Sequence, residues 1–158
     1  MIKHNLKYDL EKIRKEVDWI TSQYPDMDQV LLQSPKGDDW TTLDAPYKIH
    51  PDLRAEDFCI SNTPDDFEIT KFMIDTKIFR TRLLKLHQCQ CYTWHKDYGT
   101  RVHLAVHTNE QCFFIENNIA HNIPEDGYPY EVDVSGYHTA INASSYSFTR
   151  IHLVGCLR

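Results

Sequence analysis

The sequence predicts an α+β fold that is mainly β, in which N-terminal helices flank a set of strands folded as a jelly roll or barrel. Two observations support this prediction. Apolar residues recur at helical spacing within the first 25 residues, and from about residue 79 the apolar period changes to two. Helices followed by many short strands are typical of α+β architecture. We expect the 158 residues to form a single domain, with helical support over 1–78 and a jelly-roll core over 79–158.

Two helices are expected before the strands begin. The first follows an apolar stripe at spacings of three and four, which is formed by Leu6, Leu10, Ile13, Val17, Ile20 and Tyr24. Pro25 should end this helix, because proline cannot continue it. The second helix should begin after Thr63, which can act as its N-cap, and should end near Lys77. Residues 33–57 have no regular pattern, so they either line the mouth of a pocket or cover one edge of the core.

Short strands separated by turn signals are expected in the second half of the chain. They should begin at Phe79 and continue at 101–107, 111–116, 129–134, 138–142 and 149–156. Within 101–107 the alternation directs Val102, Leu104 and Val106 to one side, and Arg101, His103, Ala105 and His107 to the other. A basic cluster on the first strand segment is interpreted as a mostly solvated face rather than a binding patch; it consists of Lys77, Arg80, Arg82 and Lys85.

Composition and charge exclude several classes of protein. The formal net charge is −6, and an acidic surface repels phosphate backbones, so nucleic acid is not an expected partner. No run of 18 apolar residues is present, so no membrane span is expected. The N-terminus lacks the apolar run of a secretory signal. The simplest interpretation is a soluble, cytoplasmic protein.

The five cysteines do not indicate a disulfide framework, because their number is odd and no C-x-x-C pair occurs. His87, Cys89 and Cys91 could suggest a zinc site. However, no second ligand pair follows at zinc-finger spacing, so reduced core or strand cysteines are the better interpretation.

Three residues in the strand-rich half could bind a metal ion. His95 and Asp97 are two positions apart, so at the end of an extended strand both side chains point to the same face. His138, which begins a predicted strand after the Ser135-Gly136 turn, is the best third ligand. Two histidines and one carboxylate on one octahedral face are the ligand set of non-haem Fe(II) oxygenases. The sequence therefore predicts a facial triad that binds Fe(II) for an oxygenase.

Arg150 is a candidate binding residue for a carboxylate. It shares one strand face with His152 and Val154, and an inward arginine inside a small barrel requires an anion. A bidentate pair with the distal carboxylate of 2-oxoglutarate would meet that requirement. A structural salt bridge with one of the 23 acidic residues would meet it equally well. Arg101 and His103 repeat the Arg-x-His pattern and could face the same cavity, or could be ordinary interior residues.

Several segments together resemble the aspartyl/asparaginyl β-hydroxylase family of Fe(II)/2-oxoglutarate-dependent dioxygenases. The matching segments are RTRLLKL (80–86), WHKDYGTRVHLAVHTN (94–109), GYPYEVD (127–133), HTAIN (138–142) and RIHLV (150–154). The resemblance implies a double-stranded β-helix, a jelly roll of cupin-like form. It also implies that His95, Asp97 and His138 bind iron, that Arg150 anchors 2-oxoglutarate, and that Arg101 and His103 lie near this cosubstrate.

The expected reaction is the hydroxylation of an unactivated C–H bond by Fe(II), 2-oxoglutarate and O₂. The expected substrate is an amino acid, free or as a side chain within a peptide or protein. Two alternatives stay open: a cupin-type metal enzyme that does not use 2-oxoglutarate, and a ligand-binding jelly roll without catalysis. Segments 33–57 and 117–128 are the expected lids over the iron. Within them Trp40, Tyr47 and His121 could contact substrate, or could anchor their loops.

Overall fold

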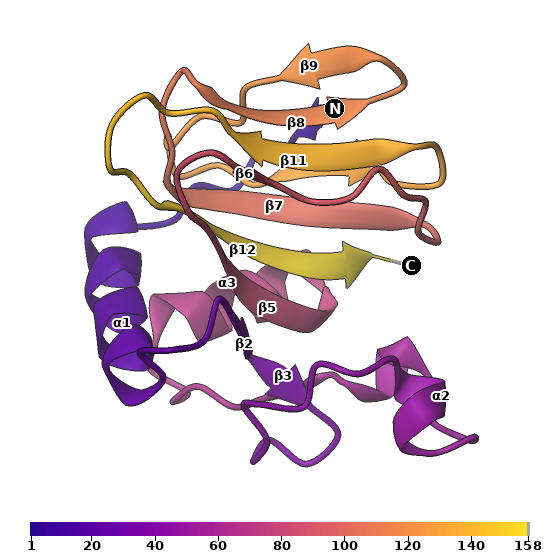
Figure 1. The fold of residues 1–158 in the computed structure, drawn as a ribbon. Helices are drawn as coiled ribbons and strands as arrows, with labels where there is room; N and C mark the ends of the chain where they lie inside the picture. The colour runs from indigo at the N-terminus through magenta and orange to yellow at the C-terminus, as the bar shows by residue number, and fades with distance from the viewer. Residues whose placement is uncertain (158) are drawn as a thin grey trace.

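The computed structural model describes residues 1–157 as two antiparallel sheets with three α-helices, an α+β fold that is mainly β (Figure 1). The larger sheet has the strand order β1 (Ile2–Lys3), β10 (Tyr130–Asp133), β7 (Thr100–His107), β12 (Arg150–Leu157), β5 (Phe79–Leu86) and β2 (Gln29–Leu31). The smaller sheet has the order β6 (Gln90–Cys91), β11 (His138–Asn142), β8 (Cys112–Glu116) and β9 (Ile119–His121). Strands β3 (Gln33–Ser34) and β4 (Ile60–Ser61) form a separate pair.

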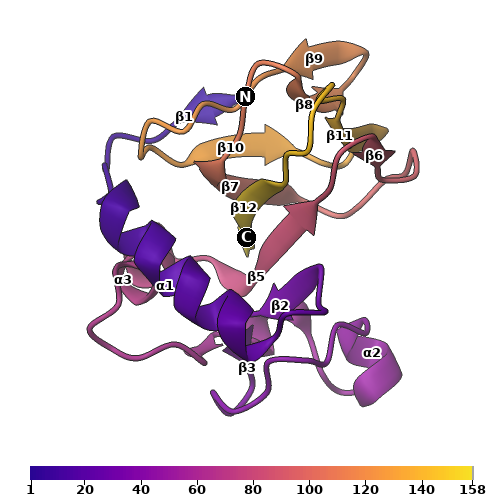
Figure 2. The same cartoon turned by 60° about the vertical axis from the view of Figure 1, so that its left-hand side comes forward.

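The larger sheet has a hydrophobic core on each face. Helices α1 (Leu10–Gln23) and α3 (Glu68–Thr76) cover one face, and Figure 2 shows both on the side away from the smaller sheet. The core on this side includes Val102, Leu104 and Val106 of β7, as the alternation in the sequence predicted. The core on the other side joins the two sheets, with Leu86, Ala105, Tyr130 and Val132 from the larger sheet and Phe114 and Ala140 from the smaller one. No strand pairing among residues 1–157 closes the sheets into a barrel.

The first predicted helix is confirmed except at its start. Ile13, Val17 and Ile20 are buried on one side of α1, but the exposed Leu6 lies before the helix. Asp9 caps the helix instead: its carboxylate accepts hydrogen bonds from the backbone N–H groups of Glu11 and Lys12, at 3.1 and 3.2 Å. A capping carboxylate satisfies N–H groups that have no partner within the helix.

The second predicted helix begins later than expected, and Thr63 is not its cap. Helix α3 begins at Glu68, and its flanking residue Phe67 makes no side-chain cap bond. The cap comes from α1: the carboxylate of Glu16 accepts hydrogen bonds from the N–H groups of Glu68 and Ile69, at 2.7 and 2.9 Å. Thr63 is buried and shares a hydroxyl hydrogen bond of 2.6 Å with Thr70. A cap supplied by another helix leaves no local signal in the sequence.

Most strands predicted from the alternation are confirmed to within two residues at each end, but the chain contains more strands than expected. Strand β2 adds to the edge of the larger sheet by pairing with β5, and β9 lies within the predicted 117–128 loop. Segment 33–57 begins with strand β3 and also contains the short helix α2 (Pro46–Ile49) and one 3₁₀ turn, Ala55–Asp57. No helix among residues 1–157 is long and apolar enough to cross a membrane.

Candidate metal centre

His95, Asp97 and His138 come together at one end of the two sheets, as the sequence predicted. His95 and His138 form an antiparallel backbone bridge, with hydrogen bonds of 3.2 and 2.9 Å between their N–H and C=O groups. Their ring centroids are 4.3 Å apart. The backbone N–H of Asp97 is held by the carbonyl of Val134 at 2.9 Å. One ligand atom from each of the three side chains lies within 4.8 Å of the others, so together they could hold a metal ion.

The backbone orients both imidazole rings for metal binding. The Nδ1 atom of His95 lies 2.5 Å from the carbonyl oxygen of Thr93, and Nδ1 of His138 lies 3.1 Å from that of Gly136. A carbonyl oxygen only accepts hydrogen bonds, so each Nδ1 must carry the proton and donate it. In the neutral ring, Nε2 then has a free lone pair. Metal-binding histidines are typically oriented by such a hydrogen bond from their second nitrogen.

Arg101 orients the third ligand. Its Nη2 donates to Oδ2 of Asp97 at 3.1 Å, and its Nη1 donates to the carbonyl of Tyr98 at 2.9 Å. A carboxylate has about four lone-pair sites, so this bond leaves Asp97 able to bind an ion as well. Arg101 therefore acts on Asp97 directly, a contact that was not predicted from the sequence.

A cavity of about 340 Å³ opens beside the triad, between the two sheets. Its walls include all three triad residues and also Arg101, His103 and Arg150, the residues that were expected near a cosubstrate. Phe114 of β8 packs between the histidines of the wall, with its ring centroid 5.6 Å from that of His138 and 5.2 Å from that of His103. The cavity thus combines a metal-binding end with a cationic interior.

Arg150 faces this cavity as the buried first residue of β12, with only 2% of its surface exposed. Its Nη2 donates to Nδ1 of His152 at 3.1 Å, and no salt bridge within residues 1–157 involves it. Burial lowers the pKa of Arg150 to about 10, so the guanidinium stays charged near neutral pH. The alternative, a structural salt bridge between Arg150 and an acidic residue, is therefore not present in the described part of the chain.

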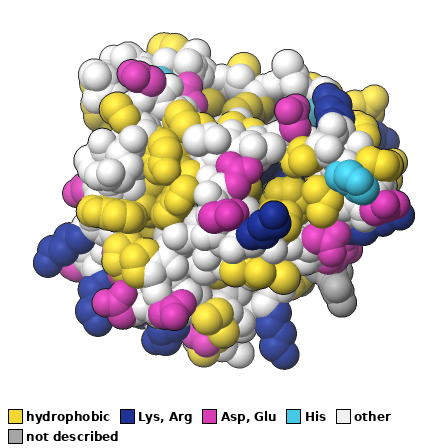
Figure 3. Space-filling view, turned by 90° about the horizontal axis from the view of Figure 1, so that it is seen from below, with side chains coloured by type: hydrophobic (Ala, Val, Ile, Leu, Met, Phe, Trp, Pro, Cys, Tyr) yellow, Lys and Arg dark blue, Asp and Glu magenta, His cyan; other side chains and the backbone are white. Residues whose placement is uncertain are grey.

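The interpretation of the basic cluster on β5 as a solvated face is wrong for its two arginines. Arg80 and Arg82 line the same cavity, on the strand face that they share with Leu84. Lys85 points to the other face, and Lys77 is exposed just before the strand. On the surface seen from below the orientation of Figure 1, the exposed basic side chains are interspersed with acidic ones (Figure 3). The sequence signal is ambiguous here: Leu84 and Leu86 alternate in phase with both arginines, but Phe79 and Leu83 make the other face of the strand apolar as well.

Two of the three residues proposed to contact substrate lie away from the cavity. Trp40 packs against the core beneath α1, stacked on Tyr24 with ring centroids 5.7 Å apart, so it anchors its loop. His121 lies on β9 and places Nε2 3.3 Å from Oε1 of Glu116. Tyr47 lies closer to the site: it lines a second hollow, of about 640 Å³, which shares Arg80, Asp97 and Arg101 with the cavity. Segment 33–57 thus contributes to the mouth of the site through its second half.

Two buried histidines should make stability depend on pH. Burial, and then repulsion from Arg150, lowers the pKa of both His103 and His152 well below the usual value. An unfolded histidine titrates near pH 6.5, so below this pH the unfolded chain binds protons that the folded protein excludes. Their stabilising contribution is present above about pH 6.5 and is lost as the pH falls. We expect the free energy of unfolding to decrease by up to about 1.4 kcal/mol per pH unit for each histidine.

Urea unfolding of the metal-free protein at pH 7.5, 6.5 and 5.5 measures this slope. His152→Gln keeps an oxygen that can accept from Arg150 but removes one titrating group. The slope below pH 6.5 should then fall by up to about 1.4 kcal/mol per pH unit, the contribution of one histidine. An unchanged slope in this variant would show that His152 does not contribute to the pH dependence of stability.

The three metal ligands form the only group of this kind found among residues 1–157, and the alternative zinc ligands His87, Cys89 and Cys91 are not part of one. All five cysteines are free thiols. The chain matches no protein-family model and no curated protein. Its function is therefore inferred from the residues of this metal centre and of the cavity beside it.

Proposed function

We propose that this protein is an Fe(II)- and 2-oxoglutarate-dependent dioxygenase that hydroxylates an unactivated C–H bond of an amino acid, free or within a peptide. The observation that carries the proposal is a single cavity whose wall includes both a His-Asp-His triad and the buried guanidinium of Arg150, which has no carboxylate partner within residues 1–157. Each feature alone is compatible with several functions. A metal site and a carboxylate site within one cavity are the two requirements for binding 2-oxoglutarate to iron.

The donor set fits Fe(II). Two neutral imidazoles and one carboxylate are the ligands of non-haem Fe(II) oxygenases, and they leave positions open for a cosubstrate and O₂. The Nδ1 hydrogen bonds of His95 and His138 favour the required tautomer before any ion arrives. When bound, iron and 2-oxoglutarate supply the oxidising chemistry: one oxygen atom of O₂ enters the substrate C–H bond and the other enters succinate, with release of CO₂.

Three residues of the wall fit the cosubstrate. Arg150 offers a fork of N–H donors that matches the distal carboxylate of 2-oxoglutarate. His103 has a buried Nδ1 without a hydrogen-bond partner within residues 1–157, so it could contact the same ligand. Arg101 keeps the carboxylate of Asp97 in place. Phe114 and Val154 supply apolar walls that limit the access of water to the metal.

The order of the strands supports the finer assignment of the fold as a double-stranded β-helix. From β5 to β8 successive strands alternate between the larger and the smaller sheet, and from β9 to β12 they alternate again, starting in the smaller sheet. This alternation is what a jelly roll requires. It agrees with the resemblance of residues 80–154 to the aspartyl/asparaginyl β-hydroxylase family, and the ligands would then stand at one end of the double sheet.

Anaerobic titration with Fe(II) followed by 2-oxoglutarate tests the proposal. We expect one equivalent of iron to bind, and a weak visible charge-transfer band to develop when 2-oxoglutarate is added. Metal binding without this band would instead favour a cupin-type enzyme that does not use 2-oxoglutarate. The absence of metal binding would favour a ligand-binding jelly roll. Zn(II) serves as the control ion, because it can bind the same ligands without producing the band.

A further inference from the structure

The cavity contains more positive charge than the proposed reaction needs. Among residues 1–157, four arginines line it, namely Arg80, Arg82, Arg101 and Arg150, and the only carboxylate in its wall is that of Asp97. Arg101 is paired with Asp97, and the proposed function assigns Arg150 to 2-oxoglutarate. Arg80 and Arg82 then have no carboxylate partner within residues 1–157. Arg80 and Arg82 are only partly exposed, and charges withdrawn from water are normally paired, so this surplus indicates a second anionic ligand.

Arg82 has donors available for such a ligand. Its Nη1 donates to the neutral amide oxygen of Gln29 at 3.1 Å, which orients the guanidinium without neutralising it. Its Nε is buried and has no hydrogen-bond partner within residues 1–157. Burial lowers the pKa of Arg82, and repulsion from Arg80 lowers it further. Both the unused donor and the repulsion would be relieved by a carboxylate in the cavity.

An irregularity in β5 places Arg80 beside Arg82. The pairing of β5 with β12 shifts between Val154 and Cys156, and Arg80 has a φ of +52°, a value that non-glycine residues rarely adopt. Such irregularities often redirect a side chain at a functional site. The Nη2 of Arg80 donates to the backbone carbonyls of Leu43 and Asp44, at 3.3 and 3.0 Å, which fixes its guanidinium at the mouth of the cavity. No carboxylate takes part in these bonds.

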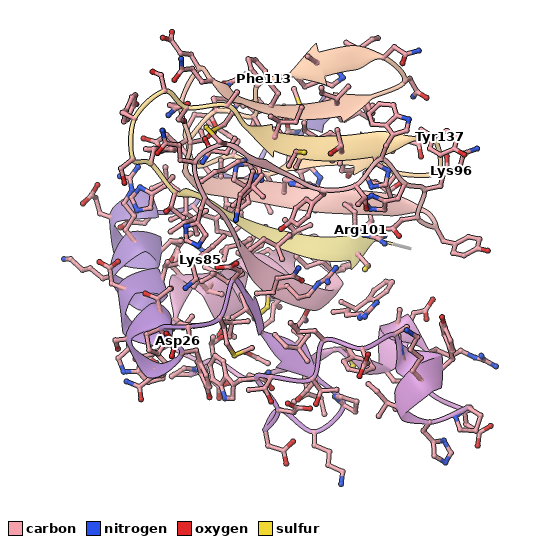
Figure 4. All side chains as sticks on the ribbon, in the orientation of Figure 1. Asp26, Lys85, Lys96, Arg101, Phe113 and Tyr137 are labelled. Atoms are coloured by element: carbon pink, nitrogen blue, oxygen red, sulfur yellow. The ribbon has the colours of Figure 1, made fainter. Side chains whose placement is uncertain are left out.

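The backbone positions of Arg150 and Arg82 lie at different ends of the cavity wall. Arg150 is opposite Leu86 on β5, whereas Arg82 is opposite Val154, four residues further along β12. At about 3.3 Å per residue, this places roughly 13 Å between the two positions along the sheet. In Figure 4, Arg101 lies at the same end as Lys96 and Tyr137, and Lys85, which is next to Leu86, lies at the opposite end. Arg82, and Arg80 beyond it, therefore lie toward the end of the cavity that holds Arg101 and Asp97, where the second hollow adjoins it.

We infer that the substrate carries a carboxylate, which binds to Arg82 and Arg80 at the mouth of the cavity while Arg150 holds 2-oxoglutarate at the other end. This inference rests on the proposed function. It narrows the substrate class to molecules with a free carboxylate, either the α-carboxylate of an amino acid or the side chain of an acidic residue. A neutral amino-acid amide would leave both guanidinium groups without a counter-ion.

The test compares matched acids and amides on the protein loaded with iron and 2-oxoglutarate under anaerobic conditions, where binding is measured by calorimetry. The panel holds the free L-amino acids beside their α-amides, together with aspartate beside asparagine and glutamate beside glutamine in capped dipeptides. We expect at least one acid to bind at least about 30-fold more tightly than its amide, as for a charged partner in a buried pair. The arm that shows this preference identifies which carboxylate is recognised. On admission of O₂, the same compound should gain one oxygen atom by mass spectrometry.

Arg82→Gln is the diagnostic variant. It should weaken binding of the preferred acid by about 30-fold or more, remove the preference for acid over amide, and leave the affinity for 2-oxoglutarate within about 3-fold. Arg82→Lys, which keeps the charge, should recover part of the preference and shows whether the site still folds. Lys85→Gln removes a positive charge from the opposite face of the same strand and should leave the affinity for both ligands unchanged.

Failure of the inference can be distinguished from failure of the proposed function. If the wild-type protein gives no visible band with iron and 2-oxoglutarate, the proposed function fails and this inference fails with it. If the band is normal but every acid binds no better than its amide, or none binds, only the inference is overturned. The inference alone is also overturned if Arg82→Gln weakens the binding of 2-oxoglutarate as strongly as the binding of the acid, because Arg82 would then belong to the cosubstrate site.

Discussion

His138→Ala is expected to abolish both iron binding and the iron-dependent conversion of 2-oxoglutarate to succinate. His138 supplies one of three protein ligands, and its Nε2 is freed for the metal by the bond from Nδ1 to the carbonyl of Gly136. Changes to groups that merely orient a ligand typically cost 10- to 100-fold in metal affinity, so we expect loss of the ligand itself to cost more than about 100-fold. Iron content after gel filtration and succinate formation without added substrate measure the two effects.

The controls separate a lost ligand from a damaged fold. His138 is buried and stacks on Phe114, so alanine also leaves a cavity there. His138→Gln retains most of the side-chain volume and should lose iron equally. His107→Ala replaces a histidine of β7 that does not line the cavity, and should keep both iron and turnover. Retained iron-dependent turnover in His138→Ala and His138→Gln would show that the triad is assigned incorrectly.

The parts of the fold that could be predicted from the sequence are those encoded by local periodicity. The apolar stripe of α1 and the alternation of β7 each specify an element and the side that it buries, and the structure confirms both. Strand β2 has no such signal, because it is three residues long and is stabilised by pairing with β5 at the edge of the sheet. The cap of α3 is likewise non-local: Glu16 is 52 residues from Glu68 in the sequence.

The same distinction holds for the site. The positions of His95 and Asp97 relative to each other follow from their spacing of two, and His138 begins a strand that the turn signals had placed. Whether a strand face is solvated depends on what packs over it. Arg80 and Arg82 were interpreted as a solvated face because the smaller sheet, which encloses their side of β5, could not be inferred from the strand itself. The wall of the cavity is therefore the part of the site that required the structure.

Arg150→Met is expected to weaken 2-oxoglutarate binding while leaving the ligand-free protein as stable as before, or more stable. Removing one partner of a buried charged pair typically costs about 2–5 kcal/mol, which corresponds to an increase in Kd of about 30-fold or more. The ligand-free protein, by contrast, holds a buried guanidinium whose one hydrogen bond within residues 1–157 goes to a neutral histidine. An apolar side chain of similar length removes the desolvation cost of that charge, so the free energy of unfolding should stay the same or rise by about 1 kcal/mol.

These two effects of opposite sign distinguish a binding residue from a structural one. If Arg150 served mainly to hold β12 in place, Arg150→Met would reduce the free energy of unfolding and the affinity for 2-oxoglutarate together. Calorimetry with 2-oxoglutarate and urea unfolding of the metal-free protein measure the two quantities separately. Arg14→Met is the matched control: this arginine of α1 pairs with Glu11 and Glu125 away from the cavity, so its loss should lower stability slightly and leave 2-oxoglutarate binding unchanged. A buried charge that costs stability in the free protein and contributes affinity in the complex is what a preformed carboxylate site requires.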